Sequence, residues 1–248
     1  MLLSKLDNIG EKTINKIAEM AFKSQIKNAE SLSVQVKTDP NKLSQGILES
    51  LNIEGYGLEM QKDLRLEKMQ ITLNNIAVSP LKALMGNVQL TQPSQGKAYI
   101  VLSEKDIEAA LNIDKLNQQL QKYEIRHHNQ NVKVKFSKVD CRIIGDGRVT
   151  VKAKLKIINT QTIESVCLVI KPCVCNSGQG IFLDEVKCTQ GKQFSSILIN
   201  AILEESAKIF NLDNFLMDGI SLDVNHLTME EGKLNLLAIA GITHLPIR

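Results

Sequence analysis

The chain of 248 residues contains no tryptophan, three tyrosines and six phenylalanines, so aromatic residues account for 4% of it. Proteins that bind single-stranded nucleic acids stack bases on aromatic side chains, and so few rings make such platforms hard to build. The net charge of +3 is also far from that of a polybasic nucleic-acid binder. No apolar run approaches the ~20 residues that a membrane-spanning helix needs. We therefore expect neither a nucleic-acid partner nor a spanning helix.

An export signal and a disulfide framework are not indicated either. Charged residues interrupt the first 26 positions, at Lys5, Asp7 and Glu11 among others, and leave no uncharged core for a signal peptide. The five cysteines are an odd number and are expected to be reduced, mostly buried thiols of a cytoplasmic protein. A hydrophobic content of 43% without low-complexity runs is typical of a globular chain. We predict one domain over residues 1–248.

Helical periodicity is present at both ends of the chain and in its middle. Residues 1–28 repeat apolar side chains every three or four positions, which predicts an amphipathic helix. This helix either packs in the protein interior or lies in a membrane interface. Further helices are predicted near 103–123, where Ser103 is a candidate N-cap, and near 193–210. A short helix is expected to begin after Asp39-Pro40.

Most of the region 30–248 instead alternates apolar and polar residues with a period of two, which is typical of strands with one buried face. The alternation slips by one residue between Leu66 and Met69, which indicates a bulge or a twist. Ser79-Pro80 breaks the pattern. Strands are predicted near residues 32–36, 56–60, 64–73, 87–90, 98–102, 162–175, 180–188, 220–229 and 233–242.

The clearest strand signal is a hairpin from 131 to 158. Gly145-Asp146-Gly147 suits a three-residue loop in which Gly147 is left-handed. This loop places Lys152 opposite Asp140 as a cross-strand ion pair, and the apolar faces stay matched only if a residue bulges near Ser137-Lys138. The expected apolar pairs are Val149 with Ile143, Val151 with Cys141, and Ala153 with Val139. The pattern as a whole predicts an α+β fold: a long, curved antiparallel sheet packed around the amphipathic N-terminal and C-terminal-half helices.

Catalytic and metal-binding motifs are weak or missing. Gly55-Tyr56-Gly57 fails the dinucleotide fingerprint, because Met60 replaces its third glycine, and the chain has no Walker A, HExxH or GxSxG motif. Cys173 and Cys175 form either a zinc or redox site or simply two small apolar residues of a strand, and no second CxxC-type pair accompanies them. His127-His128 has no neighbouring acidic cluster. We predict no catalytic residue, no metal and no cofactor.

A stripe of lysines follows the hairpin. Lys152, Lys154 and Lys156 alternate with the apolar positions, and Lys133 and Lys135 lie beside them. Such a stripe is most simply the solvated outer face of a hairpin. The alternative is docking on anionic lipid headgroups, to which each basic residue near the surface adds ~1 kcal/mol.

Several segments resemble the LmeA-like phospholipid-binding protein family, in the same order along nearly the whole chain. Val101–Ile107 resembles the start of a family helix, with a leucine, a hydroxyl residue and acids. Phe210–Phe215 followed by Gly219–Leu222 resembles the closing segment of the family. The other matching segments are Thr38–Gly46 and Gly55–Glu67.

This resemblance implies non-catalytic binding, with or without transfer, of phospholipid or another fatty-acyl lipid in an apolar groove or tunnel. It implies no catalytic residues. The alternating strands and flanking helices are also similar to those of tubular lipid-binding modules, in which a curved sheet wraps a helix around an apolar tunnel. We expect a cytoplasmic protein, peripheral on the cytosolic face of a membrane. The expected apolar wall is Phe136, Val151, Leu155, Val166, Leu168, Ile170 and Phe182, and the expected headgroup contacts are Lys42, Lys62 and Arg65.

Two other functions remain open at this stage. The chain could be a protein-interaction or assembly factor with a dry core, which uses a sheet edge or the opening helix to bind its partner. An enzyme would need a cluster of charged residues in a cleft, and the sequence does not indicate one. The sequence does not determine the oligomeric state.

Overall fold

A computed structural model describes residues 15–16, 18–60, 64–80, 82, 90–111, 113–120, 125–127, 130–174, 180–190, 199–200, 202–204, 207 and 217–244. The chain divides into two compact units. Unit 1 comprises Met1–Val101, Leu212–His226 and Leu236–Arg248, and unit 2 comprises Leu102–Asn211 and Leu227–Asn235.

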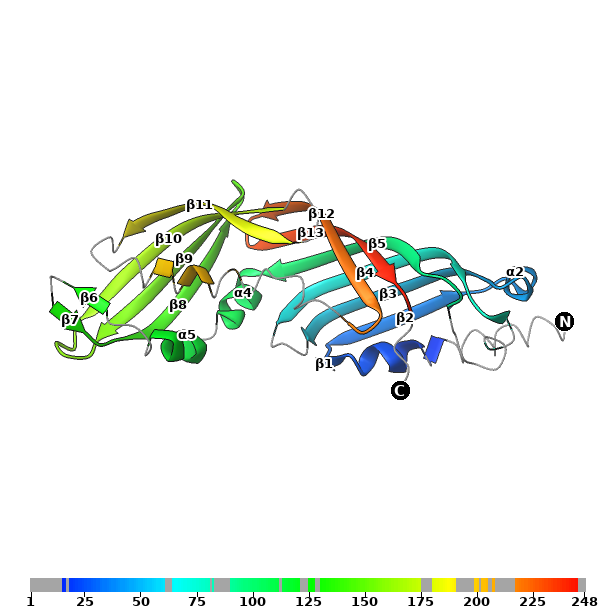
Figure 1. Cartoon of the computed structure of the whole chain (residues 1–248), viewed down its shortest axis with the longest axis horizontal. Coiled ribbons are helices and arrows are strands. Elements are labelled where there is room, and N and C mark those ends of the chain that lie inside the picture. Colours follow the sequence, from blue (N-terminus) through cyan, green and yellow to red (C-terminus); the bar gives the residue numbers. More distant parts are fainter. Residues whose placement is uncertain are drawn as a thin grey trace. The chain divides into compact units, whose positions relative to one another are not determined.

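A seven-stranded antiparallel sheet contains the strands of unit 1 (Figure 1). Its order is β1-β3-β4-β5-β13-β12, and β2 also pairs with β3. The strands are β1 (Ile26–Asn28), β2 (Ser31–Lys37), β3 (Ile47–Met60), β4 (Arg65–Ala77), β5 (Ser94–Ser103), β12 (Ile220–Glu230) and β13 (Lys233–Ile242). The unit boundaries fall inside β5, β12 and β13. The prediction of a single domain stays a prediction.

The apolar face of this sheet is built by residues that lie opposite one another on neighbouring strands. The alternation of the sequence therefore becomes rows of buried side chains across the sheet. One row joins Val34, Ile53, Ile71 and Ala98, and the next joins Val36, Leu51, Leu73 and Gly96. The short helix α2 (Pro40–Ser44) precedes β3, and its N-cap is Asp39, whose carboxylate accepts from Asn41 N and Lys42 N, as the sequence predicts.

The phase slip in β4 does not arise from a bulge. β3 and β4 stay in one register on both sides of it, with Tyr56 opposite Lys68 and Leu58 opposite Leu66. Between these pairs, Gly57 has a φ of +57°, a left-handed conformation that glycine adopts without steric cost. Of the two readings that the sequence allowed, the bulge is therefore wrong, and the slip accompanies a local change of backbone conformation.

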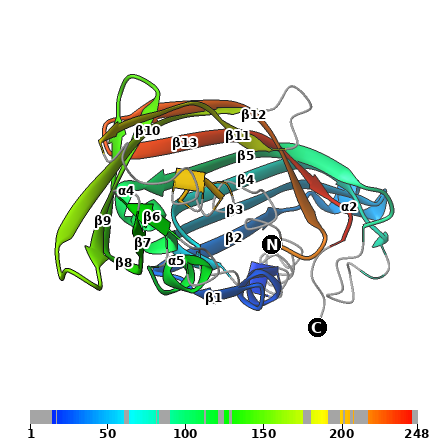
Figure 2. The same cartoon turned by 60° about the vertical axis from the view of Figure 1, so that its left-hand side comes forward.

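Unit 2 contains a four-stranded antiparallel sheet of order β11-β10-β9-β8, which can be followed in Figure 2. The strands are β8 (Val134–Ile144), β9 (Arg148–Ile157), β10 (Ile163–Val174) and β11 (Ile181–Gln190), and a separate small pair is β6 (Ile125–His127) with β7 (Gln130–Val132). The predicted hairpin register is confirmed at all three apolar pairs, and the register shift falls between Phe136 and Lys138. Gly147 has the expected left-handed φ of +83°.

The ion pair that we predicted across this hairpin is wrong. Asp140 does lie opposite Lys152, but its carboxylate pairs with Lys138. Lys138 lies two positions before Asp140 on the same strand, so both side chains point to the same outer face, and Lys138 is the lysine that pairs with the carboxylate. This hydrogen bond and the positive charges around it lower the pKa of Asp140.

Two helices, α4 (Glu104–Ala110) and α5 (Ile113–Leu120), pack against the edge strand β8. The α4 helix begins with the predicted N-cap Ser103 in a capping box with Asp106. Two other acids of this helix cover the edge of β8. Glu104 Oε1 accepts from Ile143 N at 2.7 Å, and Glu108 Oε2 accepts from Cys141 N at 3.4 Å. Covered edge groups are unavailable for pairing with another chain.

A side chain of α5 binds the backbone of β8 next to the bulge. Asn117, which is buried, accepts from Phe136 N at 2.7 Å and donates to Phe136 O at 3.2 Å. Its amide thus pairs with both backbone groups of Phe136, which avoids the cost of leaving them buried and unpaired.

The amphipathic end segments are described only in part. Residues 15–16 and 18–23 are helical, and Ala18 and Phe22 are each 1% exposed. The burial of Phe22, the only aromatic residue of this segment, supports packing in the interior over a membrane interface. Residues 199–200, 202–204 and 207 of the predicted 193–210 helix are helical, and the rest of that helix and residues 1–14 lie outside the described residues.

Antiparallel sheets with few helices confirm the predicted α+β class. In the described portion of the chain, no helix is both long and apolar enough to cross a membrane.

Candidate lipid-binding surfaces

The predicted apolar wall lies on one face of the four-stranded sheet. Phe136 of β8 lies opposite Leu155 of β9, and Val151 of β9 lies opposite Leu168 of β10. Two further rows are apolar, with Ala153 opposite Val166 and Val149 opposite Ile170, whereas Glu164 of β10 lies opposite Leu155 at one end of the wall. The structure therefore brings six of the seven predicted wall residues together, and each is at most 3% exposed.

Phe182, the seventh predicted wall residue, lies on the other face of the sheet. It lies opposite Cys173 on β10, whereas the wall continues through Pro172, which lies opposite Leu183. Paired residues of an antiparallel sheet share a face, so Phe182 points away from the wall. Its 45% exposure agrees with this placement.

The central rows of the wall are apolar, and Glu164 adds a carboxylate at one end. Cys141, which lies opposite Val151, contributes a thiol to the wall, and it is 1% exposed. Burial raises the pKa of this thiol to about 12, with help from the negative charges of Glu104 and Glu108. Cys141 is therefore neutral near pH 7 and acts as a small hydrophobic residue.

The raised pKa of Cys141 predicts a loss of stability in alkali. The unfolded thiol loses its proton near pH 9 and the folded thiol only near pH 12, so the unfolded state binds fewer protons between these values. The free energy of unfolding should then fall by ~1.4 kcal/mol per pH unit from this residue. Denaturant unfolding from pH 8 to 11 should show a steeper decline for the wild type than for Cys141→Ala, which has no thiol to titrate. Parallel declines would contradict the assignment.

The headgroup candidates do not form one site. Lys42 Nζ pairs with Glu49 Oε1 at 2.9 Å, which raises the pKa of Lys42, and Arg65 pairs with Glu30. Glu49 lies near the beginning of β3, whereas Arg65 lies opposite Glu59 near its end. Ten residues of extended strand separate these points by ~33 Å. Both candidates also belong to unit 1 rather than to the unit of the wall. The third candidate, Lys62, lies outside the described residues.

Unit 1 contains an apolar pocket that the sequence analysis did not single out. Its cavity volume is about 10 Å³, which holds one water-sized sphere. The alternation of β3 and β4 is the sequence signal that marks several of its residues, although nothing in that pattern indicates a void. The lining is Val36, Leu48, Leu51, Leu73, Ile76, Leu90 and Ile242.

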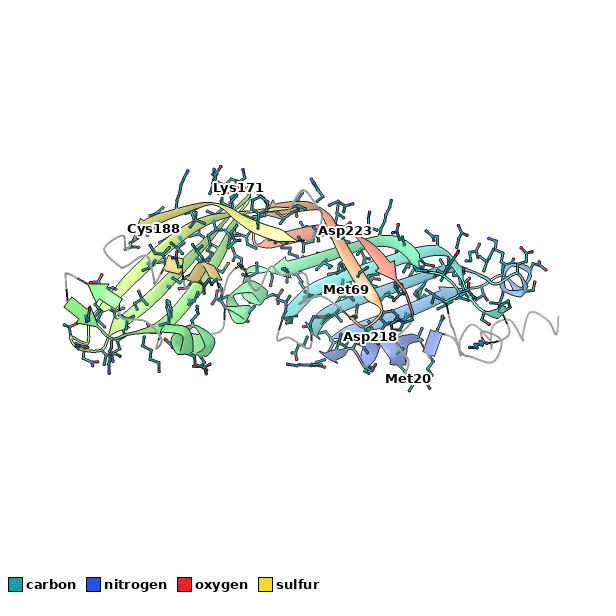
Figure 3. The ribbon with its side chains drawn as sticks, viewed as in Figure 1. Met20, Met69, Lys171, Cys188, Asp218 and Asp223 are labelled. Carbon is teal, nitrogen blue, oxygen red and sulfur yellow. The ribbon has the colours of Figure 1, made fainter. Side chains whose placement is uncertain are left out.

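The sulfur and imidazole candidates form no centre among the residues that the structure describes. Within that part, no three His, Cys, Asp or Glu side chains gather closely enough to hold a metal ion. Cys167 and Cys173 are free thiols on the outer face of β10. Cys188 Sγ, labelled in Figure 3, donates to Gln190 O at 3.2 Å. Cys175 and His128 lie outside the described residues.

Comparison with known proteins agrees with the apolar character of the wall. A family model of LmeA-like phospholipid-binding proteins matches residues 6–239, which is nearly the whole chain. No curated protein and no solved structure matches the chain. The match spans both compact units and every described strand except the last residues of β13. The chain belongs to the LmeA-like phospholipid-binding family.

Proposed function

We propose that this protein binds phospholipid non-catalytically, with the acyl chains held against the apolar face of the four-stranded sheet. The observation that carries the proposal is the continuous wall of six aliphatic and aromatic side chains on three adjacent strands. Each methylene that leaves water for such a surface contributes ~0.8 kcal/mol. A wall whose central rows carry no charged group suits an acyl chain.

The buried polar groups of the described residues also support binding over catalysis. The buried polar and charged side chains there are Ser50, Ser94, Asp106, Asn117 and Asn235. Asp106 completes the capping box of α4, and Asn117 pairs with the backbone N–H and C=O of Phe136 in β8. Both therefore have structural roles, and neither is poised as a general acid or base.

The proposal includes a peripheral position at a membrane, because a protein that takes up or releases phospholipid has to reach the bilayer surface. The cytosolic face is the side that we propose. Four described cysteines are free thiols, which suits a reducing compartment.

A protein-interaction factor with a dry core is the second candidate. The unit 1 pocket of about 10 Å³ is by itself too small for an acyl chain. The wall residues are likewise covered by the folded chain itself. Lipid binding by this wall therefore requires the covering layer to make room for the acyl chains.

Mass spectrometry of an organic extract of the purified protein distinguishes the two functions. The lipid-binding function predicts about one phospholipid per protein, in the extract itself or after incubation with phosphatidylcholine liposomes and reisolation. Heat-denatured protein carried through the same steps controls for lipid that adheres non-specifically. An extract without phospholipid after both steps would contradict the proposal and favour the dry core.

A further inference from the structure

The outer face of the four-stranded sheet, opposite the wall, carries a cluster of lysines that we call the lysine face. On this face Lys135 lies directly opposite Lys156, and Lys138 lies opposite Lys154. Like charges directly opposite each other on a sheet are destabilising. The lysine face consists of Lys133, Lys135, Lys138, Lys152, Lys154 and Lys156, all exposed.

The positive charge of this face is largely uncompensated within the part of the chain that the structure describes. Asp140 is the acid that lies in register with these lysines, and its carboxylate pairs with Lys138. No described carboxylate forms an ion pair with Lys135, Lys154 or Lys156. An anionic surface would relieve the repulsion among these ammonium groups.

Two exposed isoleucines lie among the lysines, at the turn between β9 and β10. Ile163, which is 65% exposed, lies opposite Lys156, and Ile158 is 40% exposed. Ile158 N donates to Lys133 O at 2.8 Å, which places these two residues side by side. Exposed aliphatic side chains framed by lysines match a bilayer surface, where the ammonium groups meet headgroup phosphates and the isoleucines reach the acyl boundary.

We propose that the lysine face docks the protein on anionic phospholipid membranes, with Ile158 and Ile163 inserted. This inference rests on the proposed function and names the surface by which the protein meets its lipid source. A nucleic acid fits the lysine face less well, because the residues of β8 and β9 that point to this face include no aromatic side chain for stacking. The lysines, together with the exposed Ile158 and Ile163, therefore favour an anionic bilayer as the partner.

Vesicle cosedimentation tests the docking surface. The wild type should bind vesicles of 30% phosphatidylserine in phosphatidylcholine at 100 mM salt, and binding should weaken at 500 mM salt and with pure phosphatidylcholine. Lys135→Glu/Lys156→Glu should reduce the partition coefficient by about 25-fold or more, since each lysine contributes about fivefold. Ile163→Ser should reduce it at both salt concentrations.

The matched control reverses two exposed lysines elsewhere, Lys37→Glu/Lys97→Glu, with the same change in net charge. An equal loss of binding in this control, or unchanged binding in Lys135→Glu/Lys156→Glu, would overturn the proposal. So would tighter binding of a fluorescent RNA oligonucleotide than of vesicles. The single variant Lys135→Glu guards against misfolding, because it replaces a repulsive cross-strand pair with an attractive one and should raise stability while it lowers vesicle binding.

The two proposals fail separately. Lys135→Glu/Lys156→Glu leaves the wall intact and should keep its extractable phospholipid after direct exposure to detergent-dispersed lipid. A protein that binds anionic vesicles but yields no phospholipid would refute the lipid-filled wall and retain the docking face. A protein that yields phospholipid but does not bind anionic vesicles would refute the docking face alone.

Discussion

Replacing Leu168 with tryptophan is expected to lower the phospholipid recovered with the purified protein by about tenfold or more. Leu168 is fully buried and lies opposite Val151 at the centre of the wall. Extra side-chain volume in a packed site costs about 1–3 kcal/mol. The bound lipid is not covalently attached, so its loss relieves this overpacking, and the affinity for lipid falls. A cost of ~1.4 kcal/mol already reduces affinity tenfold. Phospholipid per protein, measured by mass spectrometry, checks this prediction.

The neighbouring residue provides a matched control. Val169 is on the same strand but faces the other side of the sheet, where it lies opposite Thr150 and Lys187. Val169→Trp makes a comparable change in size and should retain the wild-type lipid content. Thermal unfolding of both variants reports whether each is folded. A folded Leu168→Trp variant with undiminished phospholipid would show that the lipid does not contact this wall.

Replacing Gly96 with alanine is expected to lower the free energy of unfolding by about 3 kcal/mol. A Cβ atom on Gly96 would lie 2.1 Å from Thr72 O and 2.9 Å from Leu73 Cγ. The first of these atoms belongs to the backbone of the adjacent strand β4, so it can move only if β4 and β5 separate. The expected result is partial loss of the sheet around the apolar pocket that Leu73 lines.

Chemical denaturation with urea measures this effect, and Gly145→Ala is its control. The nearest atom to a Cβ on Gly145 is Glu231 N at 3.9 Å, which is ordinary contact. This variant should change the free energy of unfolding by less than ~0.5 kcal/mol. Similar unfolding midpoints for the two variants would mean that β4 and β5 are not packed as closely at Gly96 as described.

Local features of the fold could be predicted from the sequence because a few adjacent residues encode them. Asp39 and Ser103 each cap a helix as expected, since a cap depends on hydrogen bonds to the next three residues. The register of the hairpin follows from Gly147 and the apolar alternation on either side of it. The bulge before Lys138 follows from the same alternation, because only one extra residue keeps both apolar faces matched.

The binding candidates were predicted with mixed success for a related reason. Six wall residues share a face because the period of two and the hairpin register together determine their orientation. Phe182 does not share this face. Its orientation depends on how β11 pairs with β10, and several registers of that pair agree with the sequence. Lys42 of α2 precedes β3 and Arg65 lies opposite Glu59 near its end, so the length of β3 separates the two headgroup candidates.

The sequence by itself determined the class of fold, the hairpin register, the helix caps and the family to which the chain belongs. Only the tertiary structure decided that the acids of α4 cover the edge of β8, that Arg65 pairs with Glu30, and that no described carboxylate pairs with Lys135, Lys154 or Lys156. The physical reason is distance along the chain. Alternation and capping act within a few residues, whereas ion pairs and covered edges depend on which distant segments the folded chain brings into contact.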